Sequence, residues 1–286
     1  MAQDIGPKRE LLIELLIDKI PKELHIHIPH RWWFIGDVLI TTIPEKLKQY
    51  RSAVGEAFLQ LEPKRARTVL GKTGPTRGIT REPSFDYLAG DKNTETIHKE
   101  LGCFFKLDAA KLTFSPGNHF ERERMLNVVK SNEFIIDMFS CVGNLSLPLA
   151  VHKSPKQVIA AEINSLAFKY LEENIQLNKV SNVMKAIEGD NRVILKDYEG
   201  KADRVISGYL HSDEEQIRQA VRLCNNNSIF HYHVAITRKK EKQAEVMTDI
   251  KRLIESEGRI CSRMIRKRVK KYAPGVEHIV LDIEID

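Results

Sequence analysis

Three acidic residues in the second half of the chain have the type and the position to bind a nucleoside. They are Asp137, Glu162 and Asp190, and each stands at or just beyond the end of an apolar run that is typical of a buried strand. In a doubly wound sheet the carboxyl ends of the parallel strands meet at one edge, where nucleotides bind. At that edge Glu162 can accept hydrogen bonds from two ribose hydroxyls, and Asp190 can accept one from an adenine amino group.

The turn after Asp137 indicates which nucleoside derivative would bind. Its small residues, from Ser140 to Gly143, let backbone N–H groups approach a ligand closely. The segment has no GxGxxG pattern and no phosphate-binding loop, and Cys141 stands where a glycine is expected. This combination favours the adenosine of S-adenosylmethionine over NAD or ATP. Taken alone, each acid is more often a solvated turn residue or a helix cap, so the interpretation depends on all three together.

The elements that position these acids follow from alternating apolar runs and helical patterns. Such runs predict strands buried on both faces, with crossover helices between them. The runs are Phe134–Met138, Val158–Ala161, Val183–Ile187, Val205–Ile206 and Ile229–Ile236. Helices are expected from Asn164 and over Glu214–Leu223, and the runs Arg259–Val269 and His278–Ile285 predict antiparallel edge strands that close the sheet. The pattern indicates a doubly wound, Rossmann-like α/β domain.

The first part of the chain has a different character and predicts a smaller α+β domain. We expect a domain over residues 1–114, beginning with a short helix, and a catalytic domain over residues 115–286. Within the first domain the patterns predict a strand at Ile26–Ile28, a strand over Trp32–Ile40 with a break at Gly36, and a helix over residues 45–61. The Gly- and Pro-rich residues 71–93 indicate turns and short strands.

Composition narrows the class of protein. The 286 residues are 42% hydrophobic and 29% charged, which is typical of a folded globular chain and argues against disorder. No apolar run is long enough for a membrane span, and the charged N-terminus is unlike a signal peptide, so we expect a cytoplasmic protein. The four cysteines are widely spaced and the histidines are not clustered, so no metal site is expected. A net charge of +6 is compatible with nucleic acid but does not require it.

Several segments together resemble a group of tRNA-modifying enzymes. The segments in the second half are Asp137–Gly143, Glu162–Asn164, Gly189–Arg192 and Ala202–Val205. Earlier segments that fit the same group are Ile35–Leu39, Gly90–Asp91, Thr94–Gly102, Phe114–Asn118 and Glu121–Arg122. The group contains the guanine-37 N1-methyltransferases and the archaeal-type wybutosine-synthesising aminocarboxypropyltransferases. The resemblance covers residues 30 to 286 and implies a class I, Rossmann-like S-adenosylmethionine-dependent methyltransferase fold.

Two loop segments distinguish the methyltransferases of this group from the aminocarboxypropyltransferases. The methyltransferases typically have an arginine directly after Ser-Pro and an Asn-Leu-Pro after the fourth strand, where this chain has Gly117-Asn118 and Gly208–His211. Both departures resemble the aminocarboxypropyltransferases, as does Phe230–His233. The resemblance then implies transfer of the 3-amino-3-carboxypropyl group to C7 of 4-demethylwyosine at position 37 of tRNA-Phe, by a monomer that contacts the anticodon loop. The alternatives are a guanine-37 N1-methyltransferase and a non-catalytic tRNA-binding protein.

The resemblance also assigns site residues. The cofactor-binding positions that it implies are Ser115, Arg122, Glu162, Asp190 and Asn191, in addition to Asp137 from the strand pattern. Arg122 can hold the carboxylate of the cofactor as a bidentate partner, or form an ion pair with a nearby acid such as Glu121 or Glu123. No catalytic residue is assigned. Tyr209 and His211, just past the fourth strand, are candidates that equally fit ordinary loop residues.

A basic run near the end of the chain is the candidate RNA-binding surface. Residues 259–271 contain seven Lys and Arg. Strand alternation predicts that Arg266, Arg268 and Lys270 lie on one face, where they would bind phosphates without reading sequence. A solvated strand face explains the same run equally well. Lys64, Arg65 and Arg67 form a smaller cluster that leaves the same two interpretations open.

Overall fold

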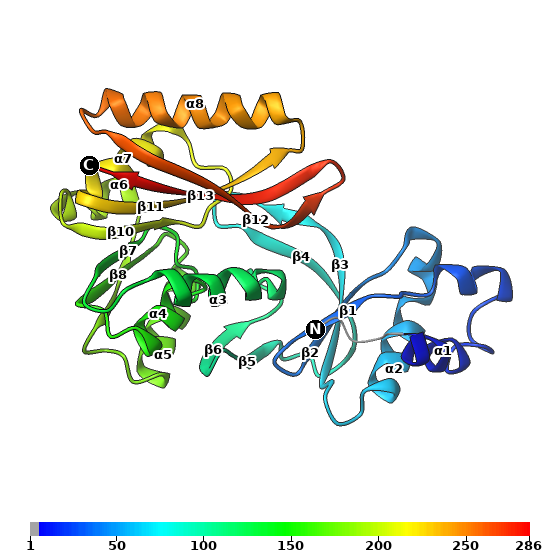
Figure 1. Cartoon of the computed structure of the whole chain (residues 1–286). Helices are drawn as coiled ribbons and strands as arrows, with labels where there is room; N and C mark the ends of the chain where they lie inside the picture. The colour runs from blue at the N-terminus through cyan, green and yellow to red at the C-terminus, as the bar shows by residue number, and fades with distance from the viewer. Residues whose placement is uncertain (1–5) are drawn as a thin grey trace. The chain divides into compact units, whose positions relative to one another are not determined.

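The computed structural model describes residues 6–286, which form two compact units (Figure 1). One unit comprises the chain up to Lys99 together with Lys106–Pro116, and the other comprises Glu100–Phe105 and Gly117–Asp286. The sequence led us to expect a single boundary after residue 114. In the structure the turn of the hairpin β5 (Glu95–Glu100) and β6 (Cys103–Asp108) groups with the second unit.

The first unit is built around a four-stranded sheet. Its elements are α1 (Gly6–Glu14), η1 (Lys22–His27), β1 (Trp32–Ile35), β2 (Val38–Thr42), η2 (Glu45–Tyr50), α2 (Arg51–Leu61), β3 (Thr68–Arg77) and β4 (Glu82–Gly90). The strand order is β1-β2-β3-β4, with β2 and β3 parallel and the outer pairs antiparallel. Helix α2 lies in the crossover between β2 and β3. It packs so closely that a Cβ atom at Gly55 would lie 2.8 Å from Leu88.

Two expectations for this unit were wrong, and local geometry explains both. The expected strand at Ile26–Ile28 is part of η1 and its cap, where the N–H of Leu24 donates to Pro21 O (2.8 Å) and the N–H of Ile28 to His25 O (3.1 Å). A three-residue alternation is too short to outweigh such local bonds. Residues 71–93 form most of two long strands, β3 and β4. Register shifts around Gly74 accommodate the Gly- and Pro-rich sequence in an antiparallel pair.

A cluster of hydrogen bonds centred on Arg67, here called the clasp, connects three of the segments on which the family resemblance depends: Ile35–Leu39, Gly90–Asp91 and Thr94–Gly102. The Arg67 guanidinium bonds the carboxylates of Asp37 (Nε–Oδ2, 2.7 Å) and Asp91 (Nη1–Oδ2, 3.1 Å), and it also donates to two backbone carbonyls. Burial alone would raise the pKa of Asp37, but hydrogen bonds from Arg67 and Thr96 hold that pKa below its ordinary value. The clasp joins segments that are distant in sequence. Arg67 therefore has a structural role, whereas the sequence left a phosphate-binding role open.

The second unit is a seven-stranded sheet with helices on both faces. Its elements are η3 (Pro116–Asn118), α3 (His119–Val128), β7 (Phe134–Asp137), α4 (Ser146–His152), β8 (Gln157–Glu162), α5 (Ser165–Leu177), β9 (Met184–Glu188), α6 (Asn191–Ile194), η4 (Lys196–Tyr198), β10 (Ala202–Ser207), α7 (Glu214–Leu223), β11 (Cys224–Thr237), α8 (Lys240–Ser256), β12 (Cys261–Ala273) and β13 (Val276–Ile285). The strand order is β12-β13-β11-β10-β7-β8-β9. Strands β7 to β11 are parallel, as the sequence predicted.

The last two strands differ from the expected pair of edge strands. Strand β13 is antiparallel to both β11 and β12, and it lies between them inside the sheet. Strand β12 is therefore the outermost strand on that side and runs in the same direction as β11. As a result, the C-terminal end of β12 lies at the same edge of the sheet as the ends of the parallel strands.

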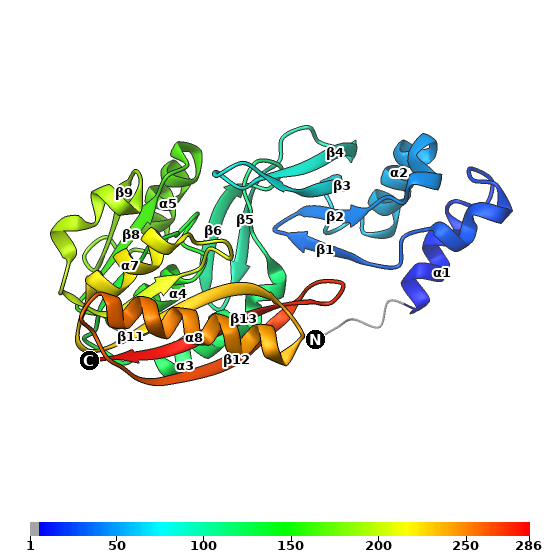
Figure 2. The same ribbon diagram turned by 90° about the horizontal axis from the view of Figure 1, so that it is seen from above.

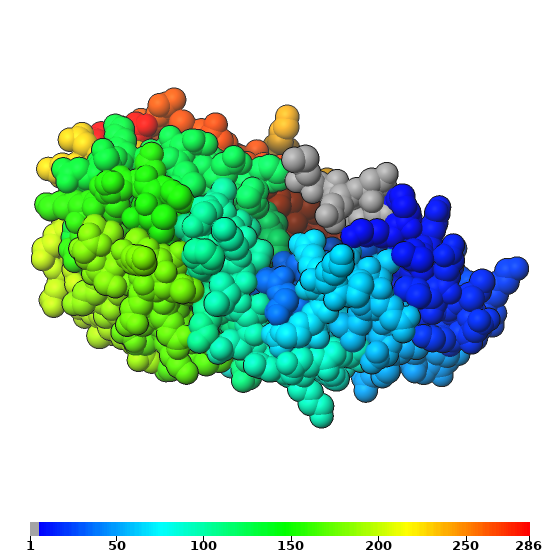
Figure 3. All heavy atoms as spheres, turned by 90° about the horizontal axis from the view of Figure 1, so that it is seen from below, coloured from blue at the N-terminus to red at the C-terminus, as the bar shows by residue number. Residues whose placement is uncertain are grey.

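The two faces of this sheet are packed differently. Helices α7 and α8 lie on one face, above an apolar core (Figures 1 and 2). Helices α3, α4 and α5 lie on the other face, which Figure 3 presents. Beneath α3 a chain of charged groups, here called the ionic layer, takes the place of apolar contacts. Its members are Glu121, Arg124, Glu133, Arg204, His231 and Asp282.

Contacts in the ionic layer are short and continuous. Arg204 bonds Glu133 (2.6 Å) and His231 (2.5 Å), and His231 bonds Asp282 (2.5 Å) through its other ring nitrogen. Asp282 continues the chain to Arg124 (2.7 Å). Burial alone would raise the pKa of Asp282, but the hydrogen bond from His231 and the charge of Arg124 hold that pKa at about 2. A buried charge with this many partners is held in place by the whole set.

Candidate cofactor-binding and catalytic edge

The ends of β7, β8, β9 and β10 meet at one edge of the sheet, as the sequence predicted. Three backbone hydrogen bonds join them: Ser140 N–H to Ala161 O (3.0 Å), Gly189 N–H to Glu162 O (2.9 Å) and Met138 N–H to Ile206 O (3.0 Å). A side-chain bond adds to these, because Asn191 Nδ2 donates to Met138 O (3.1 Å). The loops that carry the predicted residues are thus fixed relative to one another.

Backbone hydrogen bonds fix the orientation of the Glu162 side chain at this edge. Its half-buried carboxylate accepts one backbone N–H on each oxygen, from Cys141 (2.6 Å) and from Asn164 (2.8 Å). An ionised carboxylate has about four acceptor positions, so Glu162 can accept further hydrogen bonds besides these two. Burial raises the pKa of Glu162, although the N–H bonds from Asn164 and Cys141 oppose that shift. The fold therefore orients this carboxylate while leaving acceptor capacity on it.

The backbone at Cys141 explains why a glycine is expected there. Its φ is +49°, in the left-handed region that side chains rarely adopt. This conformation points the N–H of Cys141 at Glu162. The cysteine therefore preserves the turn at the cost of local backbone strain, and the departure from glycine leaves the link between the loop and the acid intact.

Asp137 is placed to shape the turn more than to contact a ligand. Its side chain is buried, 1% exposed, and Oδ1 accepts the N–H of Phe139 (3.2 Å). Burial raises the pKa of Asp137 to about 6, against hydrogen bonds that lower it. An acid this deeply buried holds the start of the loop through the N–H of Phe139, and its role in cofactor binding stays a prediction.

Asp190 and Asn191 occupy the end of β9. Asp190 caps α6 by accepting the N–H of Arg192 (3.0 Å), and it pairs with the Arg192 guanidinium (Nη2–Oδ2, 2.6 Å). The hydrogen bond from Arg192 lowers the pKa of Asp190, which keeps it ionised. The helix cap is the alternative that the sequence left open for such an acid. Asn191 is 6% exposed, and within residues 6–286 its Oδ1 has no hydrogen-bond partner.

Ser115 and Arg122 come from different units. Ser115 is half-buried and lies near the end of the first unit. Its role in cofactor binding stays a prediction. Arg122, on α3, is 1% exposed and its Nε donates to Glu100, which also lies 3.3 Å from His119 Nδ1. Of the two interpretations left open by the sequence, this geometry favours the ion pair. The partner is Glu100 and not one of the flanking acids.

The prediction that Arg266, Arg268 and Lys270 lie on one face of β12 was wrong for Lys270. In the antiparallel pair with β13, Arg266 is opposite Leu281 and Arg268 is opposite Ile279, but a register shift before Lys270 places it opposite His278. The shift turns Lys270 to the other face, since each extra residue reverses the side-chain direction. Arg266, Arg268 and Lys270, here called the β12 stripe, therefore span both faces. Arg266 and Arg268 both pair with Glu277, at 2.9 and 2.8 Å.

The histidines of the segment Phe230–His233 were not recognised as structural from the sequence. His231 belongs to the ionic layer, and His233 Nδ1 lies 2.9 Å from His278 Nε2. Burial lowers the pKa of His233 to about 3 and that of His278 to about 2, so both are neutral at physiological pH. A strand that alternates histidines with Phe230 and Tyr232 could have indicated one polar face packed against another element.

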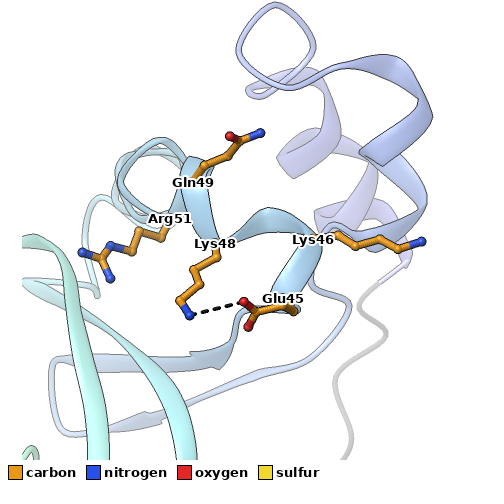
Figure 4. A pocket seen from close by; sticks show the side chains of 5 residues that line it. All are labelled: Glu45, Lys46, Lys48, Gln49 and Arg51. Atoms are coloured by element: carbon orange, nitrogen blue, oxygen red, sulfur yellow. Dashed lines mark hydrogen bonds and ion pairs between the residues drawn. The ribbon is translucent and has the colours of Figure 1, made fainter.

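The first unit has a shallow pocket that contains none of the predicted site residues. Glu45, Lys46, Lys48, Gln49 and Arg51 line it (Figure 4). Lys48 pairs with Glu45 (3.2 Å), and Arg51 turns away to pair with Asp86 (3.1 Å). The pocket therefore contains charges of both signs that are partly neutralised within the unit.

Comparison with known proteins identifies the family. Residues 96–262 match the family model described as the TRM5/TYW2 methyltransferase domain. Residues 12–94 match the TYW2 N-terminal domain. The chain belongs to the TRM5/TYW2 family. The expected Rossmann-like methyltransferase fold with an additional N-terminal part is confirmed.

Relatives within the TRM5/TYW2 family cover nearly the whole chain. The tRNA(Phe) (4-demethylwyosine(37)-C(7)) aminocarboxypropyltransferase of Pyrococcus horikoshii is 39% identical over 286 residues, covering 99% of this chain and 98% of that protein. The tRNA (guanine(37)-N(1))-methyltransferase Trm5b of Pyrococcus abyssi is 34% identical, covering 94% of this chain and 79% of that protein.

Solved structures of the family match the whole chain as well. The crystal structure of P. horikoshii TYW2 in complex with MeSAdo has a TM-score of 0.85 and 36% identity, covering 97% of this chain and 98% of that one. The complex of aTrm5 and tRNALeu has a TM-score of 0.80 and 25% identity, covering 97% of this chain and 79% of that one. Within residues 6–286 no helix is both long and apolar enough to cross a bilayer.

Proposed function

We propose that this chain transfers the 3-amino-3-carboxypropyl group of S-adenosylmethionine to C7 of 4-demethylwyosine at position 37 of tRNA-Phe. The observation that carries the proposal is the near full-length match to an aminocarboxypropyltransferase at 39% identity, which covers both units. A second support is the loop sequence at Gly117-Asn118 and Gly208–His211, where the methyltransferase branch has other residues. The donor is S-adenosylmethionine, and the coproduct is 5′-methylthioadenosine.

The reaction balances without a metal or an added oxidant. Bound S-adenosylmethionine supplies an electrophilic γ-carbon next to its sulfonium, and the nucleophile is the electron-rich C7 of the base. A C7–Cγ bond forms, the Cγ–S bond breaks with its electron pair going to sulfur, and C7 loses its proton. The chain's part is to hold the γ-carbon in line with C7 and away from solvent.

Residues at the sheet edge can provide that orientation. Glu162 would hold the ribose through its remaining acceptor capacity, and the cap at Asp190 would fix the loop around the adenine. Asn191 ties this loop to the β7 turn. Ser115 and Arg122 are proposed to contact the methionine part, with Arg122 doing so only if it releases or shares Glu100. Tyr209 and His211 lie beyond β10 on the side where the base would enter.

The same proposal extends to the partner and the setting. We propose that the anticodon loop of tRNA-Phe is the part bound, that the β12 stripe contacts its phosphates, and that the chain acts as a monomer in the cytoplasm. The four cysteines are free thiols, which suits a reducing compartment. The guanine-37 N1-methyltransferase alternative draws support from the 34% identity to Trm5b, but the two loop departures oppose it. The non-catalytic alternative is opposed by the retained Glu162 and Asp190 at the ends of neighbouring strands.

Labelled cofactor tests the proposal. The purified chain is incubated with tRNA-Phe that contains 4-demethylwyosine and with S-adenosylmethionine labelled either in the methionine backbone or in the methyl group. We expect only the backbone label on tRNA, together with 5′-methylthioadenosine. Methyl label on tRNA with S-adenosylhomocysteine would establish the methyltransferase instead. Binding of tRNA with neither product would establish the non-catalytic alternative. Transfer to tRNA with an unmodified guanosine at position 37 is the control, and none is expected.

A further inference from the structure

Four aromatic side chains form a continuous row along the catalytic edge of the second unit. Phe139 follows β7, Tyr209 and His211 follow β10, and Tyr272 is near the end of β12. Their ring centroids are 5.2, 5.8 and 6.2 Å apart in that order. His211 Nε2 lies 3.4 Å from the hydroxyl oxygen of Tyr272. These four residues are called the aromatic row.

The topology of the sheet brings the row together. Because β12 runs in the same direction as β11, Tyr272 reaches the edge where β7 and β10 also end. Strand β11 continues to Thr237, well past the residue that pairs with the end of β10. The loop after β10 lies along this extension, where Ala235 N–H meets Leu210 O at 3.5 Å. That loop carries Tyr209 and His211 across to β12.

The outer end of the row is open to solvent. Phe139 and Tyr209 are half-buried, whereas His211 is exposed and Tyr272 is 41% exposed. Strand β12, which carries Tyr272, has six Lys and Arg and no Asp or Glu. Exposed rings beside a basic strand suit a ligand that has a flat aromatic face and negative charge. An unpaired nucleotide has both properties, and base stacking on aromatic side chains tolerates any base.

We propose that His211 and Tyr272 form a stacking platform for an unpaired base next to the target nucleotide of the RNA. The proposal rests on the proposed function, since tRNA is the ligand. Phe139 lies in the turn that follows Asp137, where the cofactor is proposed to bind, and Tyr209 separates Phe139 from the platform. The platform is therefore assigned to a base next to the target and not to the target base itself. The rings of His211 and Tyr272 lie at 66° to each other, so one ring can stack while the other borders the base. Holding the neighbouring base would fix the target base over the cofactor edge.

Fluorescence of a labelled RNA tests this platform directly. The probe is an anticodon stem–loop RNA with 2-aminopurine beside the target position, titrated with the full chain in the presence of S-adenosylmethionine. With the native chain we expect quenching as the base stacks. Tyr272→Phe keeps the ring and should retain the quenching, whereas Tyr272→Ala should abolish it and weaken RNA binding about tenfold. Ile260→Ala, which alters an exposed apolar residue just before β12, is the control and should change neither.

Further measurements separate the outcomes. His211→Ala is the second variant and should also reduce the quenching, and both variants should keep the cofactor affinity of the native chain. A folded Tyr272→Ala chain with native quenching and RNA affinity would overturn the platform. Equal quenching losses in the two Tyr272 variants would also overturn it, because they would implicate the hydroxyl and not the ring. Quenching that depends on Tyr272 in a chain that releases no 5′-methylthioadenosine would contradict the proposed function alone.

Discussion

Replacing Glu162 with glutamine should weaken binding of S-adenosylmethionine without unfolding the chain. The carboxylate accepts one backbone N–H on each oxygen, and it has acceptor capacity beyond these two bonds for ribose hydroxyls. Glutamine keeps the shape, but it removes the charge and turns one acceptor oxygen into a donor, so the N–H of Cys141 or of Asn164 also loses its acceptor. Hydrogen bonds to charged groups contribute about 1.5–3 kcal/mol each, so the loss of one and the weakening of the other should cost about 2–4 kcal/mol. That cost corresponds to an increase in Kd of about 30- to 1,000-fold.

Calorimetric titration with S-adenosylmethionine measures this change, and thermal unfolding shows whether the variant is folded. Glu188→Gln is the matched control, because Glu188 is the exposed partner of Glu162 in the register of β8 and β9. It removes the same charge from the same edge, and we expect its Kd within about twofold of the native value. A folded Glu162→Gln chain with native affinity would refute the ribose assignment. Equal weakening in both variants would mean that net charge, and not a specific contact, is responsible.

Three further predictions concern stability and RNA binding. Since the pKa of Asp137 is raised to about 6, the folded state binds its proton more tightly than the unfolded chain, so the native chain should gain about 1 kcal/mol relative to Asp137→Asn between pH 7 and pH 5. Urea unfolding at both pH values checks this, and a constant difference would contradict it. Arg67→Ala should lower the free energy of unfolding by about 2–3 kcal/mol, because it removes one donor from each of two carboxylates and two carbonyls, while exposed Lys64→Ala should have little effect. Equal unfolding midpoints would exclude the clasp. Replacing all three residues of the β12 stripe with glutamine should spare cofactor binding and lower the salt slope of tRNA binding by roughly one to two units, because Lys270 lies on the other face of β12 from Arg266 and Arg268, whereas Glu277→Gln should raise the slope by releasing Arg238, Arg266 and Arg268. Filter binding at several salt concentrations distinguishes this from a stripe that faces away from RNA, for which neither slope would move.

Much of the second unit could be predicted because its signals are local. The bounds of α7 agree with the prediction, since Asp213 and Gln216 form a capping box at its start. Asn164 likewise caps α5 by accepting the N–H groups of Leu166 and Ala167. Apolar runs located the parallel strands, and the acids that follow them were placed at the correct edge. Signals of this kind depend on a few neighbouring residues, so they can be read from the sequence without knowledge of the tertiary contacts.

The features that could not be predicted depend on contacts between residues that are distant in sequence. Helix α3 was not recognised, because it buries Glu121 and Arg122 and no apolar periodicity marks it. Arg124 donates to Asp282, which lies 158 residues further along the chain. The register shift before Lys270 turns that side chain to the other face of β12, and no residue in the sequence there indicates such a shift. At the site the acids were found, but their protein partners, such as Arg192 for Asp190, appear only in three dimensions.

The ionic layer beneath α3 constrains how this chain can change in evolution. Removing one partner of a buried ion pair strands the other charge and is strongly destabilising, whereas replacing a whole set with apolar residues is often tolerated. Each member of the layer shares its partner with another, so a change at His231 alone would disturb both Arg204 and Asp282. We expect these positions to covary among homologues as a group. The apolar positions beneath α7 and α8 can instead exchange one at a time, by small changes in volume.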